Sequence, residues 1–260
     1  MSIPKTYKTE GVVIRQMVLG EADRIITLYT PDAGKLRAVA KGVRRQKSKL
    51  RGQLELLSRV SVSISRGRNL DVVAESQTID AFRSVTEDLE RLTRGLYLAE
   101  LTDGFTVEHS SNSPVYDLLV ETFGMLAATE QPDLLLRRFE LKLLGHSGFD
   151  PELYSCVDCR TDLEQQDHLF SCAKGGVVCP ECRTGAESLV QVSVSAMKVI
   201  RLIQRQPDFE KVAAVRVSPG ILAELERLLR TYIRYVLERG LRTTAFMDLV
   251  SSGRSAVGRG

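Results

Sequence analysis

The stretch 58-SRVSVSISRG-67 decides the fold of the N-terminal part of the chain. Val60, Val62 and Ile64 alternate with three serines, which is the period of a strand that buries one face. A glycine-containing turn and a second apolar run, 70-LDVVAES-76, follow directly. The pattern predicts a half-buried β-hairpin.

Three further strand candidates lie upstream of this hairpin, in 11-GVVIRQMVL-19, 24-RIITLYT-30 and 35-KLRAVAK-41. The last two are joined by Pro31, Asp32, Ala33 and Gly34, which are typical turn residues. Five strands in about seventy residues suit a small barrel, and the oligonucleotide-binding (OB) fold is the favoured candidate. Five strands fit other small barrels too.

Positive charge is concentrated in this region. The chain has 260 residues and a formal net charge of only +3. Between residues 35 and 68, eleven Lys and Arg side chains face one acid, Glu55, which gives a local net charge of +10. A surface whose charge serves solubility alone mixes both signs, so this segregation favours a polyanionic partner.

The densest basic stretch is 40-AKGVRRQKSKLRG-52, with six Lys or Arg and no acid. Its two bounding glycines, low apolar content and lack of a helical stripe predict a mobile connection between the third and fourth strands. In the preceding strand, alternation places Lys35, Arg37 and Lys41 on one face. A cationic loop beside a cationic strand face suits a phosphate backbone, because contact releases condensed counterions. A solvated loop of spare charge is the alternative.

The apolar period becomes helical after residue 82. Ser84 and Glu87 form a possible capping box for a helix that runs past Ala99. Four more helices are expected: from Ser113-Pro114, from Gln131-Pro132 to the glycines at 145 and 148, over 193–207, and over 218–240. We assign these apolar stripes to the packing of a helical bundle. The tail 251–260 is expected to be disordered.

The cysteines indicate a metal site. 156-CVDC-159 and 179-CPEC-182 are separated by 19 residues, the spacing of two zinc knuckles. We expect one structural zinc ion per chain, held by Cys156, Cys159, Cys179 and Cys182, because a closed set of four thiolates offers no open position for substrate. Cys172 is left over. Cys172 or His168 as alternative ligands, and a redox-active pair, are less favoured.

No catalytic constellation is found. The chain lacks the P-loop, nucleophile-elbow, H-E-x-x-H and dinucleotide-binding motifs, and its three histidines, at 109, 146 and 168, are scattered. We therefore expect a protein that is not an enzyme. The first residues lack a secretory signal, and no apolar run approaches the length of about 18 residues that a membrane span needs. A cytoplasmic, nucleoid-associated protein is expected.

Three blocks of sequence resemble the bacterial DNA repair protein RecO family over nearly the whole chain. They are 9-TEGVVIRQMVLGEADRIITLYTPDAGKLRAVAKGVRRQKSKLRG-52, 134-LLLRRFELKLLGHSGFDPELYSCVDC-159 and 175-GGVVCPEC-182. Val43 stands where the family usually has Ala. The four paired cysteines match those members that bind zinc, while other members lack them.

The resemblance implies an α+β multidomain protein. We expect a DNA-binding OB barrel at 1–81, a helical domain in two parts at 82–152 and 189–250, an inserted zinc-ribbon-like module at 153–188, and the tail at 251–260. RecO-like proteins bind single- and double-stranded DNA, anneal complementary strands, and act with RecR to help RecA displace single-strand-binding protein. They also bind the C-terminal tail of single-strand-binding protein. For that tail Arg137 and Arg138 are guesses, and a solvated helix face is the preferred interpretation of this pair.

The candidate DNA contacts are the basic residues of the third strand, the basic loop and the following hairpin. They are Lys35, Arg37, Lys41, Arg44, Arg45, Lys47, Lys49, Arg51, Arg66 and Arg68. Annealing requires charge more than base recognition, because two complementary strands repel through their phosphates. The chain has no Trp, and Tyr7 and Tyr29 are the barrel's two aromatic residues, so stacking is expected to matter less.

Two other functions are compatible with parts of the pattern. An RNA- or ribosome-associated factor with a barrel and a zinc ribbon has the same composition, and a preference for DNA over RNA would separate the two. A zinc hydrolase or deaminase is disfavoured, because the H-x-E signature is missing and four thiolates close the site.

Overall fold

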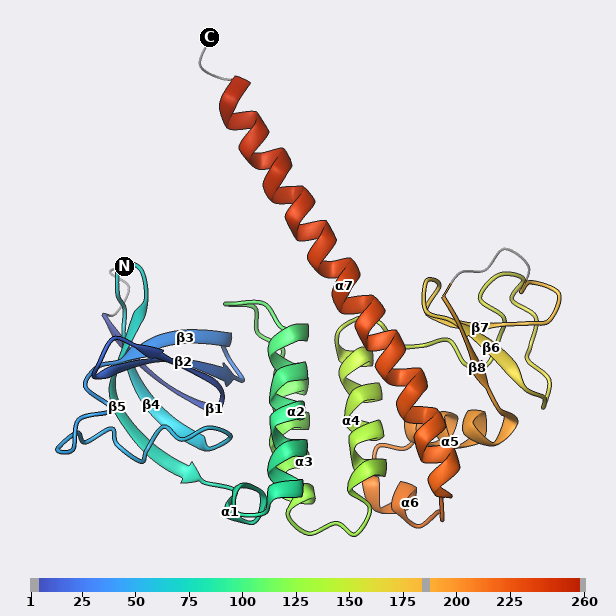
Figure 1. The fold of residues 1–260 in the computed structure, drawn as a ribbon, viewed down its shortest axis with the longest axis horizontal. Helices are drawn as coiled ribbons and strands as arrows, with labels where there is room; N and C mark the ends of the chain where they lie inside the picture. The colour runs from blue at the N-terminus through green and yellow to red at the C-terminus, as the bar shows by residue number, and fades with distance from the viewer. Residues whose placement is uncertain (1–4, 184–187, 258–260) are drawn as a thin grey trace. The chain divides into compact units, whose positions relative to one another are not determined.

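The computed structural model describes residues 5–183 and 188–257, with side chains as far as residue 238. The chain divides into two compact units, Met1–Phe139 and Glu140–Gly260. The first unit contains a β-barrel followed by helices, and the second contains helices and a small sheet (Figure 1). This two-way division is coarser than the predicted domains, whose boundaries therefore remain predictions.

The barrel is closed and has five strands, as predicted. They are β1 (Thr6–Leu19), β2 (Asp23–Thr30), β3 (Gly34–Ala40), β4 (Arg59–Ser65) and β5 (Asp71–Asp80), in the order β1-β2-β3-β5-β4. Four pairings are antiparallel, and β3 meets β5 in parallel at only two positions. β1 is longer than expected, because its first half pairs with β4 and its second half with β2.

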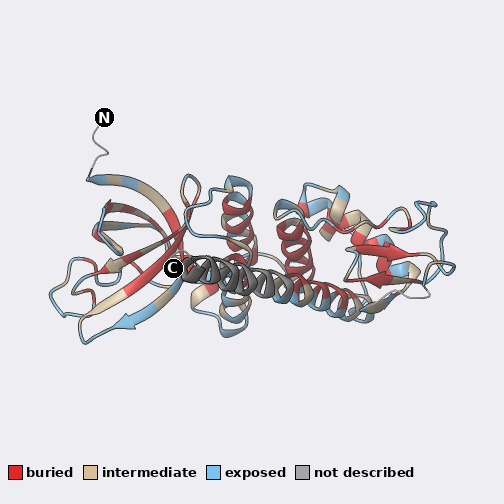
Figure 2. Ribbon diagram, turned by 90° about the horizontal axis from the view of Figure 1, so that it is seen from above, coloured by how far each residue is buried: buried red, intermediate tan, exposed pale blue. Residues whose placement is uncertain are grey.

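The barrel core follows the predicted alternation. On β3 the buried residues are Leu36, Ala38 and Ala40, and the residues between them face outward. Figure 2 shows the buried residues recurring along the strands. The core cluster also includes Val13, Ile26, Leu28, Val60, Val62, Ile64 and Val73. Burial of such side chains contributes about 25 cal/mol of free energy per Å² of apolar surface, and this burial stabilises the closed barrel.

The basic loop between β3 and β4 is anchored by apolar side chains, although little apolar content is expected there from the sequence; its mobility stays a prediction. Val43, Leu50 and Leu54 are buried in the barrel core. Hydrogen bonds from Arg45 N to Gly42 O, from Ser48 N to Arg45 O and from Arg51 N to Ser48 O form consecutive turns. Three apolar residues are few for a loop of this length, but each one fills a position in the barrel core.

Three helices follow the barrel within the first unit: α1 (Arg83–Thr86), α2 (Leu89–Phe105) and α3 (Ser113–Leu126). The predicted capping box at Ser84 is not the cap of the main helix. The side chain of Asp88 accepts a hydrogen bond from Arg91 N at 2.9 Å and begins α2 there. α3 begins at Ser113-Pro114 as predicted, and α4 (Pro132–His146) spans the boundary between the units.

The second unit contains a three-stranded sheet, β6 (His168–Ser171), β7 (Gly176–Val178) and β8 (Leu189–Val192), in the order β7-β6-β8. Its helices are α5 (Val194–Arg205), α6 (Phe209–Ala213) and α7 (Pro219–Val257). Among the described residues, no helix combines the length and apolar composition needed to cross a membrane.

The C-terminal helix differs from the sequence prediction. Its end was predicted at Gly240, yet α7 continues to Val257. A single glycine inside a helix costs only about 1 kcal/mol relative to Ala, which neighbouring helix formers offset. The expected disorder of the tail 251–260 stays a prediction, and residues 258–260 lie outside the described residues.

Candidate nucleic-acid interface and metal site

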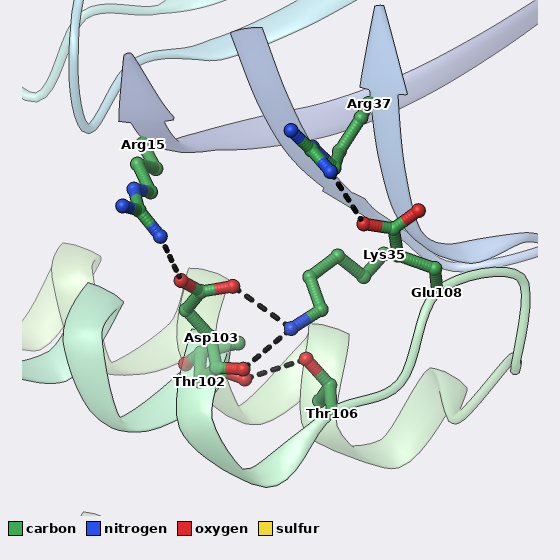
Figure 3. Close-up of polar contacts among 7 residues, drawn as sticks. All are labelled: Arg15, Lys35, Arg37, Thr102, Asp103, Thr106 and Glu108. Atoms are coloured by element: carbon green, nitrogen blue, oxygen red, sulfur yellow. Dashed lines mark hydrogen bonds and ion pairs between the residues drawn. The ribbon is translucent and has the colours of Figure 1, made fainter. Parts of the chain in front are cut away.

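Three cations on the outer face of the barrel point toward carboxylates of α2 and the segment that follows it (Figure 3). Lys35 Nζ lies 2.8 Å from Asp103 Oδ1, and Arg15 Nη1 lies 3.5 Å from Asp103 Oδ2. Arg37 Nη1 lies 3.4 Å from Glu108 Oε1. We call these five residues the strand-face cluster.

Lys35 is the most enclosed member of the strand-face cluster, with a side chain only 13% exposed. Besides the carboxylate, its Nζ donates to the backbone oxygen of Asp103 at 2.6 Å. That oxygen lies in the last turn of α2, where carbonyl groups lack partners within the helix and a cation is favoured by the helix dipole. Lys35 thus caps α2 from the barrel.

The backbone reinforces this attachment. His109 N donates to Lys35 O at 3.0 Å, and Glu108 forms an isolated parallel bridge with Lys35. These bonds use the part of the β3 edge that β5 does not reach. The structure therefore places Lys35, a predicted DNA contact, in a structural attachment between the barrel and α2.

A hollow of about 340 Å³ lies beside these residues, at the lower end of the size range for ligand sites. Its lining combines the strand-face cluster with Met17, Ile25 and Thr27. Three cations and two carboxylates leave one positive charge in excess. Arg15 and Arg37 remain accessible there, whereas Lys35 is committed to Asp103.

The predicted DNA contacts of the loop have a different environment. All six basic side chains between Lys41 and Arg51 are exposed. Within the part of the chain that the structure describes, none of them forms an ion pair with a carboxylate. They are Lys41, Arg44, Arg45, Lys47, Lys49 and Arg51, and we call them the loop cations.

The backbone of the loop that carries these cations is held by hydrogen bonds to the neighbouring hairpin. Arg44 N donates to Ala22 O at 3.0 Å, and its guanidinium donates to Gly20 O at 3.4 Å, so the loop rests on the β1–β2 turn. Gly42 N donates to Asp23 Oδ1 at 2.7 Å. A row of cations on a fixed backbone loses less entropy on binding a polyanion than a row on a disordered loop.

Arg66 and Arg68 lie in the turn between β4 and β5 and are exposed. The guanidinium carbon of Arg66 sits 5.3 Å from the centre of the Tyr7 ring, a cation–π contact. Tyr7 in turn donates to Asp71 at 3.0 Å. Burial and this carboxylate raise the pKa of Tyr7 to about 12.

The four paired cysteines come together as the spacing predicts. The sulfur atoms of Cys156, Cys159, Cys179 and Cys182 all lie within 4.8 Å of one another and could hold a metal ion. Two tight turns present them: Arg160 N donates to Cys156 O, and Cys182 N donates to Cys179 O. Lys174 pairs with Asp158 at 2.6 Å and fixes the first turn.

The electrostatics of Cys156 suit a metal ligand. Burial would raise the pKa of its thiol, but the N–H groups of Cys179, Cys159 and Asp158 point at the sulfur and lower the pKa to about 6. Cys179 N lies 3.3 Å from the Cys156 sulfur. N–H donors stabilise the thiolate form that a metal requires.

Neither Cys172 nor His168 belongs to this cluster. Cys172 is buried, and burial raises the pKa of its thiol to about 11, as expected for a core residue. His168 Nε2 lies 2.8 Å from Glu164 O. Arg137 and Arg138 are also buried, and Arg138 pairs with Glu121 at 3.2 Å. The interpretation of that pair as a solvated helix face is wrong.

The sequence prediction missed Arg15, Asp103 and Glu108. Asp103 lies in α2 and Glu108 in the segment after it, both about seventy residues after the strand they contact. Neither spacing nor composition indicates such a long-range pair. A second missed pair is Arg59 with Glu10, at 3.0 Å, to which Tyr116 of α3 donates at 3.1 Å.

Comparison with known proteins agrees with this architecture. A family model described as Recombination protein O N terminal matches residues 1–82, and one described as Recombination protein O C terminal matches residues 86–245. The first match covers the barrel. The second covers the helices and the cysteine module.

Curated relatives named DNA repair protein RecO match nearly the full length. One from Dehalococcoides mccartyi (strain ATCC BAA-2266 / KCTC 15142 / 195) is 38% identical, covering 96% of this chain and 98% of the relative. One from Roseiflexus sp. (strain RS-1) is 39% identical over 94% and 86%. One from Desulforamulus reducens is 34% identical over 98% of each. The chain therefore belongs to the RecO family of DNA repair proteins.

Proposed function

We propose that this chain is a recombination mediator that binds the backbones of single- and double-stranded DNA through the loop cations. The observation that carries the proposal is the row of exposed cations without carboxylate partners, held on an anchored loop. Lys and Arg side chains that neutralise phosphates release counterions and supply most of the sequence-independent affinity.

Annealing follows from the same arrangement. Two complementary strands repel each other through their phosphates, and cations that neutralise both backbones lower this barrier while the base edges stay free to pair. In agreement with the family, we propose that the protein acts with RecR, binds the C-terminal tail of single-strand-binding protein, and helps RecA load onto coated strands. These steps need binding rather than bond chemistry, so we propose that the protein is not an enzyme.

We further propose that the four-cysteine cluster holds one structural zinc ion. Four sulfurs arranged tetrahedrally around zinc, each at about 2.3 Å, lie about 3.8 Å apart. The sulfurs of Cys159 and Cys179 lie 3.7 Å apart, which fits this geometry. Zinc supplies folding free energy to a closed four-thiolate site and takes no part in DNA chemistry.

The test of DNA binding is its salt dependence on oligonucleotides of unrelated sequence. If about six phosphates of a single strand are neutralised, log K should fall with log[salt] with a slope of roughly −4. A fourfold rise in salt should then weaken binding by somewhat over two decades. A slope near zero, a strong preference for one sequence, or tighter binding to RNA than to DNA would contradict the proposal.

The test of the mediator role is annealing on strands coated with single-strand-binding protein. The protein should accelerate annealing of coated complementary oligonucleotides. With RecR present, it should also accelerate the formation of RecA filaments on the coated single strand. If the protein anneals bare strands but not coated strands, the proposed DNA binding stands and the proposed mediator role is wrong.

A further inference from the structure

The end of the β1–β2 hairpin exposes three consecutive apolar side chains. Met17, Val18 and Leu19 are 44%, 60% and 41% exposed. Scattered exposed hydrophobics are normal on protein surfaces, but adjacent ones more often mark a binding surface. We call these three residues the apolar tip.

The apolar tip is held in position. Met17 pairs with Ile25 and Leu19 pairs with Asp23 across the hairpin. The carboxylate of Asp23 also accepts the bond from Gly42 N, which ties the hairpin to the basic loop. The turn depends on Gly20, whose φ of 59° lies in the left-handed region. The three side chains are therefore exposed on a fixed backbone.

Cations flank the apolar tip on both sides. Met17 lines the hollow that also contains Arg15 and Arg37, and Figure 3 shows how these two arginines project from the strands. On the other side, the guanidinium of Arg44 donates to Gly20 O in the turn itself. Glu21 is the exposed acid of this turn. Apolar side chains between fixed cations match the amphipathic character of single-stranded DNA, which has bases along a phosphate backbone.

The aromatic residues of the barrel are not available for base stacking. Tyr29 is fully buried and its hydroxyl donates to Asn112 O at 3.1 Å. Tyr7 is half-buried, donates to Asp71, and is covered by Arg66. These are the two aromatic residues between positions 5 and 81. Tyrosine stacking is therefore not available on the described barrel surface, which leaves aliphatic side chains and guanidinium groups for contact with bases.

We propose that the apolar tip contacts unpaired bases of single-stranded DNA whose phosphates are held by the flanking cations. This inference rests on the proposed function and adds a base-contacting element to it. Aliphatic side chains against bases have precedents in proteins that insert Leu, Ile or Met between base steps.

The apolar tip should therefore favour single-stranded DNA over duplex DNA, whatever the base sequence. Bases of a duplex are stacked and paired, so the apolar tip contacts them only when they are single. As two strands pair, the bases leave the tip while the phosphates remain near the cations. The tip therefore keeps bases unstacked before annealing and does not compete with the duplex.

The experiment uses the full-length protein and a single-stranded oligonucleotide that contains 2-aminopurine, whose fluorescence rises when the base unstacks. Replacing Met17, Val18 and Leu19 with Thr should weaken single-strand binding by about five- to tenfold and abolish most of the fluorescence rise. Affinity for a duplex of the same length should change less than twofold. The salt slope should stay the same, because no phosphate contact is lost.

A matched control replaces Ile79 and Leu89, which are also exposed apolar residues of the first unit, with Thr. It should leave both affinities and the fluorescence unchanged. Val18→Thr alone is nearly isosteric at the most exposed position, so it should show a smaller loss of single-strand affinity with an unaltered melting temperature. Circular dichroism checks that each variant is folded.

Three outcomes would overturn the inference. If wild type binds DNA with a steep salt slope but the tip variants retain full fluorescence and affinity, the tip does not contact bases and the proposed function stands. If only binding to a protein partner is lost, the tip is a protein-docking surface. If wild type binds neither DNA form, the proposed function and this inference fail together.

Discussion

The barrel carries two sets of cations that differ in what surrounds them. Arg15, Lys35 and Arg37 of the strand-face cluster meet two carboxylates from α2 and its following segment. The loop cations begin only a few residues after Arg37 and meet no carboxylate among the described residues. Basic charge in a sequence thus indicates how much charge is present, whereas the fold decides how much of it a ligand can reach.

The ion pairs of the strand-face cluster differ in how exposed they are. Lys35 has a short, largely enclosed ion pair and a bond to a helix-terminal carbonyl, so it stabilises the structure. Arg37 and Glu108 are both well exposed and 3.4 Å apart, a kind of pair that contributes about 0–1 kcal/mol. Arg37 can therefore exchange its carboxylate for a phosphate at little cost, while Lys35 cannot.

The largest expected effect on DNA binding follows from replacing loop cations with neutral residues. Replacing Arg44, Arg45, Lys47 and Lys49 with Gln should remove about three phosphate contacts, weaken DNA binding roughly 100-fold at low salt, and make the salt slope shallower by about 2. The unfolding free energy should barely change, because Val43, Leu50 and Leu54 still anchor the loop. Fluorescence anisotropy at several salt concentrations measures the affinity and slope.

The matched control removes four exposed cations from the second unit, Lys198, Arg216, Arg227 and Arg230. If DNA binding depends on the loop itself, this control should keep nearly all of the affinity. Equal losses in both variants would mean that net charge, not the loop, attracts DNA, and the contrast between the two sets of cations would disappear.

The second effect is on stability. Lys35→Met should lower the unfolding free energy by about 2 kcal/mol, because it removes a charged donor from Asp103 and from a carbonyl of the last turn of α2. Arg37→Met should cost less than about 0.5 kcal/mol, because its ion pair is exposed. Urea denaturation compares the two. Equal stability losses, or a DNA defect from Lys35→Met as large as that of the loop variant, would contradict the proposed division.

A smaller effect on DNA binding is expected from removing the carboxylate of the strand-face cluster that contacts two cations. Asp103→Asn removes the carboxylate that neutralises Arg15 and Lys35, so DNA affinity at low salt should rise two- to fivefold, with a slope steeper by up to about 0.7. Glu130→Gln, an exposed acid elsewhere in the first unit, is the control for net charge. The idea fails if both substitutions raise affinity equally, or if Asp103→Asn lowers it.

Much of the fold was predictable because it depends on local periodicity. The alternation in β3 and β4 and the turn residues after β2 are visible in the sequence, and the strands they predict close into the barrel. The helix boundaries were less predictable. Asp88 rather than Ser84 begins α2, and α7 passes through Gly240, because several capping residues compete and one glycine is a weak break.

The site was predictable only in part, for a physical reason. The cysteine pairs carry their geometry in their spacing, and the structure brings their four sulfurs together. For the cations, the strand period gave the face of Lys35, but its partner Asp103 comes from a helix that packs there through long-range contacts. The anchoring of the basic loop was missed for a similar reason, since Val43 and Leu50 look isolated until the barrel closes over them.

The smallest expected effect on DNA binding comes from the metal. Wild type should contain about one zinc per chain, Cys172→Ser should retain it, and Cys156→Ser and Cys182→Ser should lose it, because only the latter two belong to the cluster of sulfurs. Loss of the metal should lower the melting temperature of the second unit, since the site contributes to its folding. Metal analysis and calorimetry measure both.

DNA affinity of the zinc-free variants should nevertheless stay within about twofold of wild type with an unchanged salt slope, because the loop cations and the strand-face cluster belong to the first unit. Cys172→Ser, which alters a buried thiol outside the cluster, separates metal loss from general disturbance of the second unit. If Cys156→Ser weakened DNA binding as much as the loop variant while Cys172→Ser did not, the DNA path would extend over the metal-binding module. The difference between the cations of the strand-face cluster and the loop cations would then describe only part of the DNA interface.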